Sequence, residues 1–92
     1  KVEMMSKIVK KFLAQIEGYV EGRHITIEWQ DSIIEYLQNE GFDAKMGARP
    51  LSRLINEKVK LPLAKLLLEN TDNHKVVISY DWKEDNVIIK TP

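Results

Sequence analysis

Apolar residues near the start of the chain recur at helical spacing. Between residues 3 and 17 they fall three or four positions apart, and most lysines of this segment occupy other positions on the helical wheel. The apolar set is Met5, Ile8, Val9, Phe12, Leu13 and Ile16. This pattern predicts an amphipathic helix over residues 3–17.

The pattern then changes to alternation. Residues 24–29 read His-Ile-Thr-Ile-Glu-Trp, which is rich in β-branched side chains and typical of a short strand. A second helix is predicted from Asp31 to Asn39, because Ile33, Tyr36 and Leu37 again follow helical spacing. We expect Gly41 to end this helix in the left-handed conformation.

Two prolines divide the next apolar segment. Helical spacing follows Pro50, at Leu51, Leu54, Ile55 and Val59, and predicts a third helix. Pro62 is expected to break that helix and to start a short, largely buried fourth helix over residues 61–69, because proline is tolerated only in a first helical turn. The polar residues 70–73 predict a turn.

The strand pattern returns near the end of the chain. Residues 76–80 and 87–89 carry β-branched side chains around a polar link, which predicts a hairpin. Two strands alone are marginally stable, so we expect residues 24–28 to join them. The predicted fold is therefore α+β, with about four helices and a small three-stranded sheet (24–28 plus the hairpin 76–90) in one domain, 1–92.

The charge balance, the apolar runs and the cysteine content of the chain limit which partners and which cellular compartment are expected. The 14 basic and 14 acidic residues cancel, which argues against nucleic acid or an anionic membrane as the main partner, so any anion site must be local. No apolar run approaches the roughly 20 residues of a membrane span, and no signal peptide is recognisable. The absence of cysteine fits a reducing compartment, and we expect the cytoplasm. Because the chain begins with Lys1, we interpret it as a fragment of a longer protein.

The sequence contains no motif for a phosphate-binding loop, a dinucleotide-binding loop or a metal site. There is no G-x-x-x-x-G-K-[ST] phosphate loop and no G-x-G-x-x-G motif. His24 and His74 each lack a second ligand at metal spacing, so no metal site is predicted and both are interpreted as surface residues.

The sequence around Arg49 raises a question of charge. Pro50 reads as the first helical residue, which would place Arg49 at the N-cap. A cation there is unfavourable by about 0.3–1 kcal/mol, because this end of a helix is already partly positive. One hypothesis is that an anion binds here, where free N–H groups, the helix dipole and the guanidinium would converge. The alternative is a solvated arginine, and Arg53 is also interpreted as a surface residue.

The residues around Arg49 also carry a family resemblance. The motif Gly47-Ala48-Arg49-Pro50-Leu51 follows Gly41-Phe42-Asp43 and precedes Lys60-Leu61-Pro62-Leu63-Ala64. Together these resemble the C-terminal small subdomain of the second AAA+ module in Clp/Hsp100 ATPases, most closely its ClpA branch. The resemblance covers almost the whole chain.

This resemblance implies a lid that packs over a nucleotide held by a preceding large subdomain. It implies that Arg49 is the catalytic sensor 2 arginine, which reaches the β- and γ-phosphates of ATP, with Ala48 beside it in the nucleotide site. It further implies that the first helix helps to wall the adenine, and Ile8 is the candidate for that contact. Mg²⁺ would be held by the full-length protein and not by this chain.

The resemblance also implies partners. These are the preceding AAA+ large subdomain, neighbouring subunits of a homohexamer, a Clp peptidase and unfolded protein substrates. The full-length protein would be an ATPase that unfolds proteins, whereas the isolated chain would not be an enzyme. Two other hypotheses stay open: a stand-alone interaction module that binds an anionic partner through the Gly-Ala-Arg-Pro helix start, and a purely structural domain of an oligomer.

Overall fold

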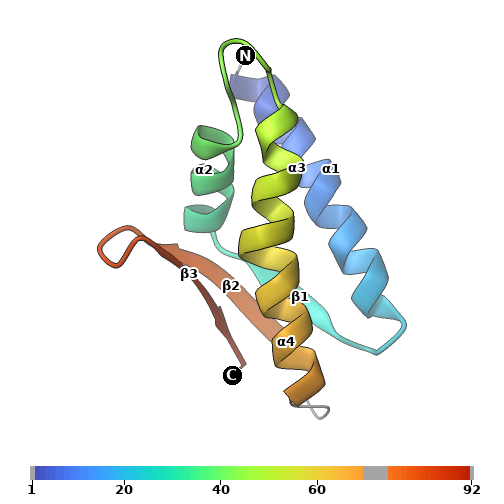
Figure 1. Cartoon of the computed structure of the whole chain (residues 1–92). Coiled ribbons are helices and arrows are strands. Elements are labelled where there is room, and N and C mark those ends of the chain that lie inside the picture. Colours follow the sequence, from blue (N-terminus) through green and yellow to red (C-terminus); the bar gives the residue numbers. More distant parts are fainter. Residues whose placement is uncertain (1, 70–74, 92) are drawn as a thin grey trace.

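A computed structural model describes residues 2–69 and 75–91 (Figure 1). The elements in chain order are α1 (Val2–Glu21), β1 (Thr26–Trp29), α2 (Asp31–Glu40), α3 (Arg49–Ile55), the π-helical segment η1 (Asn56–Lys60), α4 (Leu61–Glu69), β2 (Lys75–Asp81) and β3 (Asn86–Lys90). The α+β class predicted from the sequence is confirmed. The turn predicted at residues 70–73 and His74 lie outside the described residues.

Helix α1 forms as the apolar spacing predicts, but it extends four residues beyond the predicted end. The buried residues of its inner face are Met5, Val9, Leu13, Ile16 and Val20. Val20 continues the three- and four-residue spacing past Gly18, which explains the longer helix. The Trp29 indole N–H donates to Glu17 at 2.5 Å and so ties the end of β1 to this helix.

Segments α3, η1 and α4 form one continuous helix (Figure 1). Asn56 (φ −60°, ψ −48°) and Leu61 (φ −63°, ψ −51°) at their junctions keep right-handed helical angles. The Leu61 N–H donates to the Asn56 carbonyl five residues earlier, which widens the turn just before Pro62. A proline ring clashes with the preceding turn of a regular α-helix, and the wider π turn relieves that clash. The prediction of four helices is therefore wrong: the described residues contain three.

Helix α4 is less buried than the sequence suggested. Leu63 and Leu67 are buried, whereas Leu61 is 66% exposed and Leu68 is 78% exposed. The buried pair is four residues apart, so one face of α4 meets the core and the leucines on the other side meet solvent.

The sheet has the strand order β1-β2-β3, which confirms the predicted third strand. Strand β1 runs parallel to β2, with Thr26 opposite Lys75 and Trp29 opposite Ile78. Strands β2 and β3 form the expected antiparallel hairpin. The first strand begins two residues later than predicted, because His24 has φ +60° and belongs to the turn after α1.

An aromatic cluster joins α2 to the hairpin. The Tyr36 and Tyr80 rings stack with centroids 3.8 Å apart, and Trp82 meets Tyr80 edge-on at 4.6 Å. The Tyr80 hydroxyl donates to Asp85, and its backbone N–H donates to the Ser32 hydroxyl at 2.9 Å. These contacts hold the end of β2 that leads into the hairpin turn against α2 (Figure 1).

Gly41 sets the approach of α2 to α3. Its φ of −86° and ψ of 0° are right-handed, so the predicted left-handed helix end is wrong. A Cβ at this position would lie 2.6 Å from the Leu37 carbonyl oxygen and 2.7 Å from Leu51 Cδ1. Glycine is therefore required by close packing, because it lets the end of α2 touch the first turn of α3 where Arg49 lies.

Candidate functional site

The loop before Arg49 is closed by hydrogen bonds. Asp43 and Gly47 exchange backbone bonds, with N–H to carbonyl distances of 2.8 and 2.7 Å. The Asp43 carboxylate also accepts the backbone N–H groups of Lys45 at 2.7 Å and Met46 at 3.0 Å. Gly47 has φ +65°, a left-handed angle that glycine adopts without a Cβ penalty. These bonds give the segment that leads into Arg49 a defined conformation.

The two hydrogen bonds to Asp43 predict a pH dependence of the loop. Both stabilise the ionised carboxylate, and they lower its pKa below the usual 3.8. Because the pKa is lower in the folded chain, the stabilisation is present above pH 3.8 and is lost as the pH falls through the lower folded-state value. An NMR titration of the Asp43 carboxyl carbon should therefore give a midpoint below 3.8.

Substitution of Asp43 checks the same loop. Asp43→Ala removes the acceptor, so the N–H groups of Lys45 and Met46 should exchange several-fold faster with solvent. Asp43→Asn keeps an acceptor oxygen and should retain most of their protection, without the titration. Equal exchange in wild type and Asp43→Ala would show that the carboxylate does not order the loop.

Arg49 is the first residue of α3, and the N-cap is Ala48. The prediction that Arg49 is the N-cap is therefore wrong by one position, and Pro50 is the second helical residue. The physical reason is that the Arg49 N–H already bonds to the Met46 carbonyl at 3.3 Å, which closes the turn one residue earlier. Proline remains favourable there, because the second N–H of a helix also lacks an intrahelical partner.

The first turn of α3 offers fewer backbone donors than expected. The Arg49 N–H is bonded, the Leu51 N–H donates to Ala48 at 3.1 Å, and Pro50 has no N–H. The expected convergence of free N–H groups is thus not found at these three positions. The Arg49 side chain is exposed, and the ion pairs formed within the described residues join Arg53 to Glu57 and Lys75 to Glu28. Binding of an anion here would therefore depend on the guanidinium.

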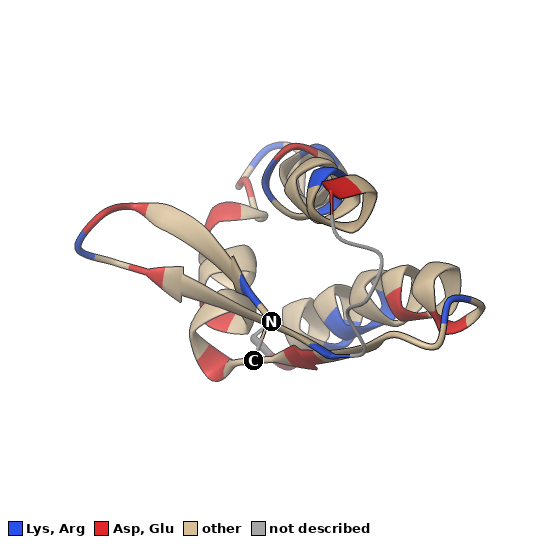
Figure 2. Cartoon of the chain, turned by 90° about the horizontal axis from the view of Figure 1, so that it is seen from below, with Lys and Arg blue, Asp and Glu red and all other residues tan. Residues whose placement is uncertain are grey.

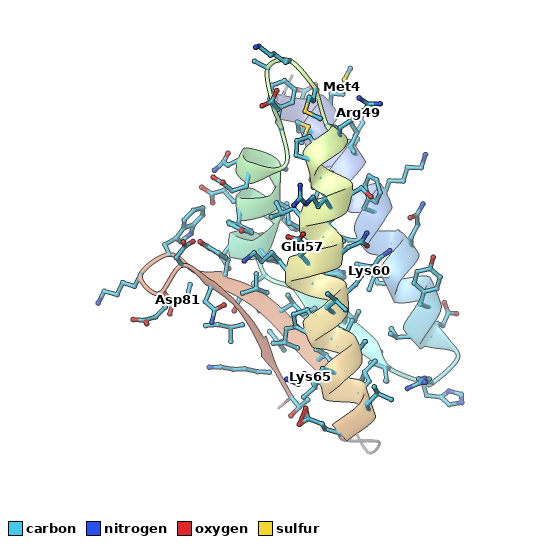
Figure 3. All side chains as sticks on the ribbon, viewed as in Figure 1. Met4, Arg49, Glu57, Lys60, Lys65 and Asp81 are labelled. Atoms are coloured by element: carbon cyan, nitrogen blue, oxygen red, sulfur yellow. The ribbon has the colours of Figure 1, made fainter. Side chains whose placement is uncertain are left out.

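The other two candidate residues are partly engaged in packing. Ala48 and Ile8 are half-buried and lie against the hydrophobic core. Met4 is 67% exposed and lies at the same end of the molecule as Arg49 (Figure 3). Sequence reasoning used Asp43 only as part of the family motif and did not predict that its carboxylate orders the loop. An aspartate that accepts backbone N–H groups two and three residues later is a recognisable turn signal.

Arg53 and His24 agree with their interpretation as surface residues. Arg53 forms an exposed ion pair with Glu57 at 3.1 Å, and His24 is exposed.

Within residues 2–69 and 75–91 no cluster of three or more His, Asp or Glu side chains could hold a metal ion. No helix within these described residues has both the length and the apolar character of a membrane span. Acidic and basic residues are spread over both helices and strands, although the charged residues of α2 (Asp31, Glu35 and Glu40) are all acidic (Figure 2).

The sequence that forms this loop and helix start matches a known protein family. A family described as the C-terminal, D2-small domain of ClpB protein matches residues 1–78, which include both the loop and Arg49. The chain belongs to this family. The recognition of a Clp/Hsp100 D2 small domain from the sequence is thereby confirmed.

Relatives of the ClpB D2-small domain carry two names. The chain is 42% identical over 88 residues to the "Chaperone protein ClpB" of Chlamydia pneumoniae and 38% identical over 85 residues to that of Bacillus cereus, covering 96% and 90% of the chain. It is 34% identical over 88 residues to the "ClpA homolog protein" of Fuscovulum blasticum, covering 96% of the chain. The chain spans only about a tenth of the length of these curated relatives, namely 10%, 10% and 11%. The ClpA branch in particular stays a prediction, because relatives of both names match.

Proposed function

We propose that this domain is the C-terminal lid of an ATP-dependent Clp unfoldase or chaperone, and that Arg49 is its sensor 2 arginine. Membership of the ClpB D2-small family supports the lid, and the exposed guanidinium at the start of a continuous helix supports the role of Arg49. A planar guanidinium can contact two phosphate oxygens at once, which a lysine cannot do. Its charge would stabilise the β- and γ-phosphates of ATP as charge develops during phosphoryl transfer.

The rest of the nucleotide site must come from another module. This chain has no phosphate loop, so the preceding AAA+ large subdomain would hold the triphosphate and Mg²⁺. Ala48 would keep the approach to Arg49 unobstructed by a large side chain. We keep Ile8 as the proposed adenine contact, because it is only half-buried and so retains surface for a ligand.

The proposed partners follow from this role. The lid would pack on the preceding large subdomain and on neighbouring subunits of a cytoplasmic homohexamer that acts on unfolded protein substrates. Delivery of those substrates to a Clp peptidase is one proposed outcome, in line with the "ClpA homolog protein". Chaperone action without a peptidase is the second candidate, and the relatives named "Chaperone protein ClpB" favour it.

A comparison of two proteins tests the proposal. The 92-residue chain alone should show no ATP hydrolysis above background, because one arginine cannot replace a phosphate loop and its magnesium. The same chain joined to its native upstream module should hydrolyse ATP, as measured by phosphate release. Turnover by the rigorously purified chain alone would contradict the lid assignment. An upstream region without Walker motifs would favour the stand-alone interaction module.

A further inference from the structure

An apolar cavity of about 370 Å³ lies between the C-terminal half of α1 and α4. Its floor is made of core residues, and its walls are formed by side chains that are largely exposed, with Tyr19 at 72% and Leu68 at 78%. The floor residues are Ile16, Val20, Leu63 and Leu67. We name this surface the α1–α4 groove. Figures 1 and 3 place it toward the opposite end of the molecule from Arg49.

The apolar surface continues along α4. A second depression shares Ala64 and Leu68 with the groove and adds Leu61, which is 66% exposed. Three of the seven large apolar side chains that are exposed in the described residues, namely Tyr19, Leu61 and Leu68, therefore gather in one place. Clustered exposed apolar side chains mark interaction sites more reliably than scattered ones.

The rim of the groove is cationic. Among the residues that the structure describes, Arg23 and Lys60 line it and no carboxylate does. The Lys60 ammonium lies 5.5 Å from the centre of the Tyr19 ring, a cation–π distance that holds the charge against the apolar wall. In the second depression Lys65 lies beside Glu57, but the Glu57 carboxylate is paired with Arg53. The charged side chains at this surface that form no ion pair within the described residues are therefore basic, and they would favour a partner with acidic residues.

The spacing of the walls fits a helix. The α1 side of the groove is lined by residues between 16 and 23, and the opposite side by residues between 60 and 68. Each set spans about two helical turns, or roughly 10 Å, at 1.5 Å per residue. Both walls are helices whose backbone groups are bonded internally, so this surface offers no edge for an added strand. Two helical sides of this length match the way that an amphipathic helix lies in a groove.

We propose that the α1–α4 groove docks an amphipathic helix of a partner protein. The docked face would carry Leu, Ile or Phe at two-turn spacing, and a carboxylate would face Arg23 and Lys60. The apolar floor and the zero net charge of the chain disfavour nucleic acid as the occupant. This proposal needs neither nucleotide nor Arg49, so it stands or falls separately from the proposed sensor 2 role.

A displayed library of helices tests the proposal. A rigid three-turn helical scaffold with one randomised face would be selected on the 92-residue chain, without selection against any variant. Enriched sequences should carry apolar residues at two-turn spacing flanked by Asp or Glu. The enriched peptide should bind Leu68→Asp at least about tenfold more weakly, whereas Met4→Asp, an exposed apolar position at the other end of the molecule, should bind as wild type does.

Charge reversal is the second arm of this experiment. The double variant Arg23→Glu/Lys60→Glu should weaken the acidic peptide about tenfold and should prefer the same peptide with Lys in place of its acidic residues. Three results would overturn the proposal. These are enrichment of basic flanks, equal binding to Leu68→Asp, and failure to enrich any helix. Self-association of the chain that Leu68→Asp abolishes, measured by ultracentrifugation, would assign the groove to a second copy and would also overturn it.

Discussion

Replacement of Arg49 by Ala in the full-length protein should lower ATP turnover by an order of magnitude or more while the domain stays folded. The loss is expected because the guanidinium would act mainly on charge that develops in the transition state. Arg49→Lys should be intermediate, since an ammonium supplies charge without bidentate contact. Arg53→Ala is the matched control: its side chain is exposed four residues further on and pairs with Glu57, so turnover should stay within about twofold.

The stability of the Arg49→Ala domain separates a functional role from a structural one. Arg49 is exposed and pairs with none of the described carboxylates, and a cation at a helix start is unfavourable by about 0.3–1 kcal/mol. The melting temperature of the isolated domain should therefore stay level or rise. A domain that melts well below wild type would identify Arg49 as a structural residue and would remove the physical basis for its contact with phosphate.

Leu51→Ala should destabilise the isolated domain by about 2–5 kcal/mol. Leu51 is completely buried in the first turn of α3, and its side chain occupies the space that a Cβ on Gly41 would need. Removal of this side chain would leave a cavity between the two helices, and the loss is large beside the roughly 5–15 kcal/mol that stabilises a typical domain. Urea denaturation followed by circular dichroism measures the change.

Leu68→Ala is the control for this prediction. Leu68 is also a helical leucine, but it is 78% exposed, so its replacement should change stability by no more than about 0.5 kcal/mol. If Leu51→Ala cost as little as Leu68→Ala, the contact between α2 and α3 would not be part of the cooperative core. The control also shows whether the exposed leucines of α4 contribute to the fold or only to the α1–α4 groove.

Local patterns in the sequence were sufficient for most of the fold. The spacing in α1 and the alternation in β2 reflect which side of each element meets the core, and that is a property of neighbouring residues. The pairing of β1 with the hairpin followed from the need to cover β-branched side chains. The helix count failed because the effect of Pro62 depends on the width of the turn before it, and a π turn is a tertiary adjustment that no local pattern records.

Errors at the site have a similar origin. The sequence singled out Arg49, but the N-cap position and the bonded N–H groups depend on how the loop folds back at Asp43 and Gly47. The role of Gly41 could not be read either, because it arises from contact with a side chain ten residues away in Leu51. Burial of the α4 leucines was overestimated, because the sequence shows apolar character but not whether a partner supplies the covering surface.

The continuity of the helix from Arg49 to Glu69 has a mechanical consequence. Its 21 residues, α3 with 7, η1 with 5 and α4 with 9, span about 30 Å at 1.5 Å per residue. A rigid rod of this length acts as a lever: a tilt of about 10° at the Arg49 end would carry the far end through about 5 Å. Had Pro62 broken the helix in two, such a tilt would be absorbed at the joint. Because Pro62 does not break the helix, the two ends of the domain are geometrically coupled. A small tilt at the Arg49 end becomes a larger displacement at the Glu69 end.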